Sequence, residues 1–238
     1  MKCAIVPVLV ATTINYVRKW LNSNTNKQPT TQNRKVVKIV LTGGPCGGKS
    51  TALSKVTSVR LSPRRQGSRN QSHHQSQALT NSGMRVLTVP EAATILFSNG
   101  FKSSDPIQIQ SAIMKLQISL EDLFEGIARD FEGRSVLLCD RGLMDGKAYV
   151  ETKMWHDVLK LENMKETDAR DSRYDSVIHL VTAADGASEF YTLENNTARH
   201  ENVEQAIVQD RRTQNAWIGH SRLRVIGNED DKGRKVGF

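Results

Sequence analysis

The part of the chain best suited to chemistry is the glycine-rich stretch Gly43–Ser50, which reads GGPCGGKS. It follows the run KVVKIVLT over residues 35–42, which predicts a buried strand, and it precedes a predicted helix over 49–59. Glycines let backbone N–H groups turn inward, and these groups, together with a helix N-terminus, bind phosphate oxygens. The spacing G-x-x-x-x-G-K-S after a strand therefore predicts a P-loop that binds a nucleoside triphosphate.

The P-loop motif also predicts roles for single side chains. Lys49 is expected to reach the β- and γ-phosphates, and the Ser50 hydroxyl is expected to ligate Mg²⁺. The full set expected to contact the nucleotide is Gly43, Gly44, Pro45, Cys46, Gly47, Gly48, Lys49, Ser50 and Thr51. The run VLLCD ends at Asp140, which is placed to hold the metal directly or through water. The predicted cofactors are ATP or GTP with Mg²⁺, and the base stays open because no guanine-reading N-K-x-D or T-K-x-D segment occurs.

Four further residues are candidates for the transfer of a phosphoryl group. Glu91 follows a predicted strand and would either accept the proton of a substrate hydroxyl or favour the start of a helix. Arg141, directly after Asp140, would contact a substrate or its phosphates, or lie on the surface. Arg199 and Arg211 flank or lie on a predicted helix, together with Arg212. They would neutralise the transferring phosphoryl group from a lid, or form a solvated charged face.

The elements that must position these residues alternate between strands and helices. Period-two and β-branched runs predict strands over 35–42, 84–89, 135–139, 176–181 and 223–226. Apolar residues spaced by three and four predict helices over 49–59, 91–97, 105–131 and 202–217. This alternation predicts a kinase-type P-loop NTPase fold, a three-layer α/β/α arrangement around a five-stranded, mostly parallel sheet.

Composition divides the chain into a domain and flanking segments. We expect a basic arm and linker over 1–33, the P-loop domain over 34–228 and a polar tail over 229–238. Residues 62–83 are rich in Ser, Gln, Asn and Arg, and they predict a disordered insertion because they hold too few apolar groups to offset the entropy of ordering. The three cysteines form no C-x-x-C pair, so neither disulfides nor structural zinc are expected.

The net charge of +8 is concentrated at the N-terminal side, where no Asp or Glu precedes Glu91. This asymmetry predicts an anionic partner, either nucleotide or a phosphoinositide membrane surface, or else a solvated basic arm; a nucleic-acid partner is not expected. The apolar run over 4–17 is too short to span a bilayer, so no transmembrane segment is predicted. We expect a cytoplasmic protein with peripheral membrane association, or one that carries an N-terminal targeting segment.

Six blocks of the chain, in order, carry a resemblance to a known family. They are VVKIVLTGGPCGGKSTAL, VLTVPEAATILFSNGF, QSAIMKLQISLEDLF, VLLCDRGLMDGKAY, EFYTLENNTARHE and QNAWIGHSRLRVI. Over about 35–228, apart from the insertion, the chain resembles the P-loop AAA-type domain of bacterial NadR and of the eukaryotic TRPL-translocation-defect (Ttd) proteins. The eukaryotic branch is the closer match. The chain departs from the pattern at the insertion, at Ser221 in place of Pro, at Gly227 in place of Asp and in lacking a following CYTH-like domain.

The resemblance implies two functions. The NadR branch phosphorylates nicotinamide riboside with ATP, whereas the Ttd branch is described as binding GTP and phosphoinositides and as regulating membrane-protein trafficking. The resemblance favours a regulatory nucleotide-binding module, and the alternative is a small-molecule kinase that acts on a hydroxyl. A closed acceptor pocket beside Glu91 and Arg141 would support the kinase, whereas an open basic surface there would support the regulatory module.

Overall fold

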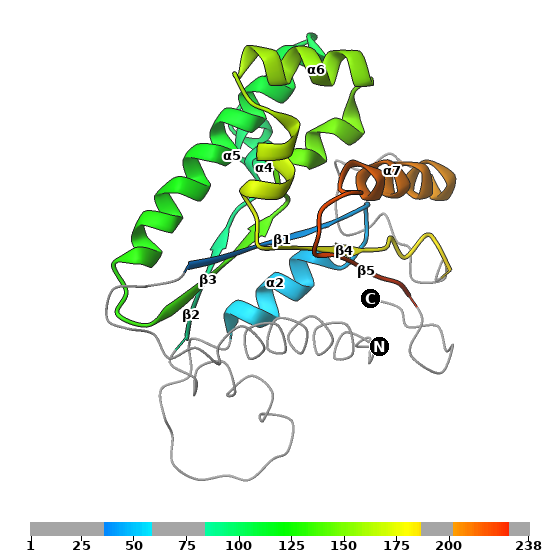
Figure 1. Cartoon of the computed structure of the whole chain (residues 1–238). Helices are drawn as coiled ribbons and strands as arrows, with labels where there is room; N and C mark the ends of the chain where they lie inside the picture. Colours follow the sequence, from blue (N-terminus) through cyan, green and yellow to red (C-terminus); the bar gives the residue numbers. More distant parts are fainter. Residues whose placement is uncertain (1–35, 59–83, 187–201, 229–238) are drawn as a thin grey trace.

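A five-stranded parallel sheet forms the centre of the molecule (Figure 1). The computed structural model describes residues 36–58, 84–186 and 202–228. The strands are β1 (Val36–Gly43), β2 (Met84–Val89), β3 (Arg134–Asp140), β4 (Ser176–Leu180) and β5 (Leu223–Ile226), in the spatial order β2-β3-β1-β4-β5. Every pairing among these strands is parallel, which confirms the predicted α/β fold class.

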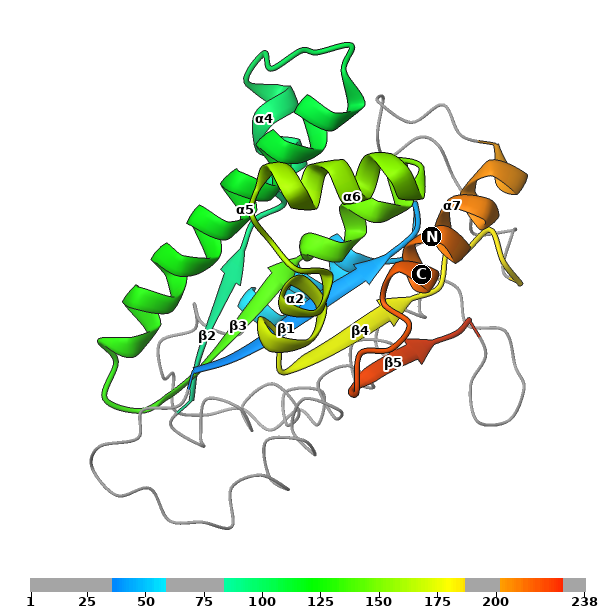
Figure 2. The same cartoon turned by 45° about the horizontal axis from the view of Figure 1, so that its top comes forward.

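Helices cover both faces of this sheet (Figures 1 and 2). One face packs on α2 (Lys49–Ser58), because alternate β1 residues such as Ile39 and Leu41 share a core cluster with Ala52 and Leu53. Val40 points to the other face, into a cluster with Trp155 and Trp217. That second face carries the helices α5 (Pro106–Arg129), α6 (Thr152–Leu161) and α7 (Val203–Ala216).

The remaining described elements are α4 (Ala92–Ser98) and the short helices η2 (Leu143–Tyr149) and η3 (Asp168–Ser172). The helices and strands predicted from the sequence agree with the structure to within about two residues. Three elements between β3 and β4 were not predicted: η2, α6 and η3. The predicted arm, insertion and tail lie outside the described residues.

A buried ionic network fixes α5 on the sheet. Glu121 of α5 is fully buried, and its carboxylate accepts hydrogen bonds from Arg173 Nε at 2.5 Å, the Tyr174 hydroxyl at 2.8 Å and Gln117 Nε2 at 2.9 Å. Lys38 of β1 lies 3.6 Å from the same carboxylate. A buried charge is tolerated only when it is paired and hydrogen-bonded, so these contacts hold α5 in one position.

The strand order brings the ends of β1 and β3 together. Leu41 of β1 pairs with Asp140 of β3, so the segments that follow the two strands start side by side. The chain leaves β1 towards β2 and leaves β3 towards β4, in opposite directions across the sheet. Ligands of open α/β sheets bind in the crevice at such a point. None of the helices in the described part of the chain has the length and hydrophobicity that crossing a membrane requires.

Candidate functional site

The glycine-rich segment forms a tight loop between β1 and α2. Gly43 has a φ of +141°, and a Cβ atom there would lie 2.1 Å from the carbonyl oxygen of Leu180. A Cβ at Gly44 would lie 2.6 Å from the Asp210 carboxylate. Glycine at these two positions therefore lets the loop pass directly against β4 and α7.

Neighbouring elements hold this loop through polar contacts. The carboxylate of Asp210, on α7, is 2% exposed and its Oδ1 accepts hydrogen bonds from the Gly44 N–H at 2.6 Å and the Thr182 N–H at 3.3 Å. The Thr182 hydroxyl in turn donates to the carbonyl of Pro45. Asn228, after β5, donates from Nδ2 to the Thr182 carbonyl at 2.7 Å. The loop conformation thus depends on segments far away in the sequence.

Lys49 folds back over the loop. Its ammonium donates to the carbonyl oxygens of Gly43 at 2.8 Å and Gly44 at 2.9 Å. Burial and the nearby Arg141 lower the pKa of Lys49 to about 8, against the opposing effect of Asp140, Asp145 and Glu91. An ammonium held against carbonyl dipoles at the mouth of the loop can exchange these partners for phosphate oxygens.

Asp140 ends β3 beside the loop. Burial and the Glu91 carboxylate raise its pKa to about 6, although Lys49 and Arg141 act in the other direction. Ser50 lies in the first turn of α2 and is exposed. Among the described residues no group of three His, Cys, Asp or Glu side chains could hold a metal. One carboxylate and one hydroxyl fit Mg²⁺, which is bound by few protein oxygens and takes its other ligands from water and phosphates.

Arg141 and Glu91 form an ion pair between the ends of β3 and β2. Arg141 Nε donates to Glu91 Oε1 at 2.5 Å, and the guanidinium carbon lies 5.9 Å from the centre of the Tyr149 ring. Arg141 has a φ of +70°, in the left-handed region that costs a non-glycine residue about 1–2 kcal/mol. Such strain is characteristic of functional sites.

Glu91 is held in its ionised form. Burial alone would raise its pKa, but the charge of Arg141 and hydrogen bonds from Thr94 and Arg141 bring the pKa below its ordinary value. Thr94 Oγ1 donates to Glu91 Oε2 at 2.6 Å, so both carboxylate oxygens have a partner. The structure thus places Glu91 and Arg141 together, as a pair rather than as separate side chains.

Sequence reasoning missed Asp145, which lies in η2 and is 3% exposed. Its Oδ1 accepts from the Thr42 hydroxyl at 2.5 Å and from Trp217 Nε1 at 2.8 Å, and its Oδ2 lies 3.8 Å from Arg141 Nη1. These contacts tie the end of β1, η2 and α7 to one carboxylate. An aspartate in the segment DRGLMD carries no local signal for such a role, because two of its partners, Thr42 and Trp217, come from distant segments.

A cavity of about 850 Å³ opens beside the ion pair. Its walls come from α4, α5, η2 and the start of α6, and its lining includes Glu91, Arg141 and Asp145. Most other lining side chains are apolar, among them Phe97, Ile113, Met114, Leu143 and Trp155. The volume is that of a site for a small organic molecule.

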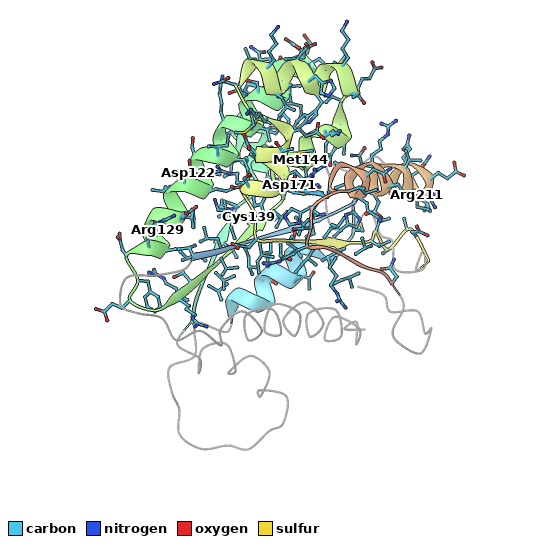
Figure 3. All side chains as sticks on the ribbon, in the orientation of Figure 1. Asp122, Arg129, Cys139, Met144, Asp171 and Arg211 are labelled. Carbon is cyan, nitrogen blue, oxygen red and sulfur yellow. The ribbon has the colours of Figure 1, made fainter. Side chains whose placement is uncertain are left out.

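The predicted lid arginines in the described part of the chain, Arg211 and Arg212, contact groups other than the phosphate loop. Arg211 of α7 is 70% exposed, with Nη2 3.9 Å from Asp185 Oδ2, and Figure 3 shows it on the side of α7 away from α5. Arg212 lines a second cavity, of about 650 Å³, between η2, α6 and α7. Arg199 lies outside the described residues. The contacts of Arg211 are those of a solvated charged face, and its role at a transferring phosphate stays a prediction.

The comparison with known families agrees with the loop and sheet geometry. A family described as "AAA domain" matches residues 38–232, which include all five strands except the first residues of β1. No curated protein matches the chain closely enough to be counted as a relative.

Proposed function

The chain belongs to the AAA-domain family of P-loop nucleotide-binding modules, and from this premise we propose that it is a Mg²⁺-dependent phosphotransferase. It would move the γ-phosphoryl group of ATP or GTP to a hydroxyl group of a small molecule. The observation that carries this proposal is the 850 Å³ cavity directly beside Glu91 and Arg141. A module that only binds and hydrolyses nucleotide has no need of a second cavity at that place.

The proposed step uses residues that already lie around the loop. The acceptor oxygen forms a bond to the γ-phosphorus, the bond from that phosphorus to the β-bridging oxygen breaks, and the nucleoside diphosphate leaves. Glu91, held ionised at the cavity wall, accepts the proton of the acceptor hydroxyl. Lys49 and Arg141 supply positive charge where negative charge gathers on the transferring group.

The metal would be held by Ser50 and Asp140, and when bound it would supply charge neutralisation on the β- and γ-phosphates. Asp145 would help to position the ion pair, because its Oδ2 lies 3.8 Å from Arg141 Nη1. The buried Asp210 keeps the loop in shape through Gly44. Lys49, Glu91, Arg141, Asp145 and Asp210 are thus each held by at least one further contact.

The regulatory module linked to membrane-protein trafficking remains the competing hypothesis. Its sequence basis is the basic N-terminal side and the family resemblance, and residues 1–35 lie outside the described residues. Around Glu91 and Arg141 the described surface is a cavity with mainly apolar walls, and not the open basic surface that this hypothesis requires there. The phosphoinositide partner consequently has no support from the described site.

The test is to incubate the full chain with Mg²⁺ and γ-labelled ATP or GTP in the presence of pooled hydroxyl compounds, including nucleosides, sugars, polyols and aromatic alcohols. Label in a new phosphomonoester, lost in Lys49→Ala, would support the phosphotransferase. Tight nucleotide binding with label that stays on the nucleotide or appears only as inorganic phosphate would contradict it and favour the regulatory module. Binding to phosphoinositide vesicles, measured in the same preparation, would test that module directly.

A further inference from the structure

The charged side chains of the cavity wall lie at one end of it. Among the described lining residues the only charged groups are Glu91, Arg141 and Asp145, and these three pair with one another at 2.5 Å and 3.8 Å. They follow the C-terminal ends of β2 and β3, on the side of the phosphate loop. The rest of the wall holds no charge that could face a charged ligand.

Polar groups are also scarce in the rest of the wall, and most are engaged. The Thr94 hydroxyl donates to Glu91, and Ser98 donates to the carbonyl of Thr94. Gln117 Nε2 donates to Glu121 at 2.9 Å and to the Arg141 carbonyl at 3.4 Å. These side chains consequently have few hydrogen-bonding positions left for a ligand.

Gln110 and Trp155 are the exceptions. Gln110 lies on α5 in the cavity wall, is 7% exposed, and its side chain makes no hydrogen bond to another described residue. Trp155 Nε1 is a buried donor without a partner among the described residues. The polar atoms of Gln110 keep some exposed surface, so a ligand donor or acceptor would take the place of water there. Gly146 lies close to the amide and its lack of a side chain makes room for it, because a Cβ atom there would lie 2.6 Å from Gln110 Oε1.

We propose that the cavity binds an uncharged, mainly apolar ring compound that bears a hydroxyl group, and that Gln110 recognises one polar substituent on its ring. The hydroxyl would face Glu91 and Arg141, and the ring would lie among Phe97, Ile113 and Met114. A charged ring would lose its hydration without gaining an ionic partner there, and such an uncompensated charge is strongly disfavoured. This inference rests on the proposed function for the orientation of the ligand, but not for its binding.

Equilibrium binding tests the inference without any turnover. The probes for calorimetry with the full chain are 2-(1H-indol-3-yl)ethanol and thymidine, which are neutral ring alcohols with a ring N–H. Their N-methyl analogues lack that donor, and nicotinamide riboside carries a cationic ring. We expect at least one neutral probe to bind roughly tenfold or more tighter than its N-methyl analogue and than the cationic nucleoside, the range for one hydrogen bond in a desolvated site.

Three variants assign that binding to the cavity. Gln110→Ala should lower the affinity for the N–H probe to that for its N-methyl analogue and should leave the analogue unchanged. Ala93→Trp, on the wall contributed by α4, should abolish probe binding. Ala112→Trp is the matched control, because Ala112 is half-buried on α5 and does not line the cavity. Thermal midpoints would show that all three variants fold.

Two results would overturn the inference. One is tighter binding of nicotinamide riboside than of every neutral probe, and the other is neutral-probe binding that survives Ala93→Trp. Failure of the proposed function has a different outcome: neutral probes bind and respond to Gln110→Ala, but no γ-label is transferred to any acceptor. Transfer of label to the cationic nucleoside alone would support the phosphotransferase and contradict the uncharged ligand.

Discussion

The carboxylate of Asp210 accepts a hydrogen bond from the Gly44 N–H at 2.6 Å, which joins α7 to the phosphate-binding loop across more than half of the chain. The same oxygen accepts the Thr182 N–H at 3.3 Å and lies 3.2 Å from His179 Nε2. One buried oxygen thus holds the loop, the end of β4 and α7 together. The residues of the loop motif are contiguous in sequence, but contacts with residues distant in sequence hold the loop in its conformation.

Replacing Asp210 with Ala should therefore destabilise the protein and weaken nucleotide binding together. The change leaves two buried backbone N–H groups without an acceptor, at a cost of about 1–3 kcal/mol each in the free energy of unfolding. Urea denaturation measures the first effect, and titration with ATP and Mg²⁺ measures the second. Asp157→Ala, at an exposed position of α6, is the control. Equal stability of the two variants would mean that Asp210 does not fix the loop.

Lys49→Ala should abolish measurable triphosphate affinity and leave the fold intact. The ammonium contacts only loop carbonyls at 2.8 Å and 2.9 Å in this structure, so the folded state loses no ionic partner when it is removed. A charge-assisted contact to phosphate contributes about 1.5–3 kcal/mol, which is roughly ten- to hundredfold in affinity per contact. Lys153→Ala, exposed on α6, is the matched control. Unchanged nucleotide affinity in Lys49→Ala would show that the loop is not part of the nucleotide-binding site.

Glu91→Gln separates chemistry from binding. The amide keeps the shape of the carboxylate but cannot accept the acceptor proton, so the transfer rate should fall by about 10²–10⁴-fold while the nucleotide affinity changes little. Rapid-quench measurement of phosphomonoester formation gives the rate, and calorimetry gives the affinity. Asp105→Asn, at the exposed N-cap of α5, provides the same chemical change away from the cavity. A rate within about twofold of wild type would exclude Glu91 as the base, since a general base contributes far more.

The affinity for nucleotide with Mg²⁺ should be highest at a pH between about 6 and about 8. As the pH rises through about 8, Lys49 of the free protein loses its proton and its attraction for phosphate. As the pH falls through about 6, Asp140 gains a proton and loses its attraction for the metal. Calorimetry across this range checks both limbs. Asp140→Asn should remove the acid limb only; if that limb persists unchanged in the variant, another group titrates there.

The sequence was sufficient to predict the sheet and the phosphate-binding loop between its strand β1 and the helix α2, and the reason is physical. The runs 35–42 and 135–139 are apolar and β-branched, so they are buried strands whatever their neighbours are. The glycines and Lys49 keep a fixed spacing because the loop wraps a small anion. These signals are local, and each can be detected without knowledge of the rest of the fold.

The segment between β3 and β4 could not be predicted in the same way. Asp145 of η2 contacts Thr42 at the end of β1 and Trp217 after α7, both far away in sequence. Gln110, on α5, lies beside Gly146 of η2, which is also distant in sequence. The helix α6 has a buried face made of Trp155, Val158 and Leu159, but a single ten-residue helix gives a weak periodic signal. The cavity itself is a space between four elements, so no motif encodes it. Sequence reasoning therefore identified the phosphate-binding loop and missed Asp145 and the cavity beside it, and the roles of the individual site residues stay predictions.

Glu121→Ala should be strongly destabilising. The fully buried carboxylate pairs with Arg173 Nε at 2.5 Å and accepts the Tyr174 hydroxyl at 2.8 Å, and Lys38 lies 3.6 Å away. Removing Glu121 leaves Arg173 and Lys38 with only their more exposed partners, Asp122 and Glu125. We expect a cost of about 3 kcal/mol in the free energy of unfolding, the lower end of the range for breaking a buried pair. Glu132→Ala, at an exposed position after α5, should change that free energy by no more than about 0.5 kcal/mol. Urea denaturation of both variants measures the difference, and a loss below about 1 kcal/mol for Glu121→Ala would show that the network does not hold α5 on the sheet.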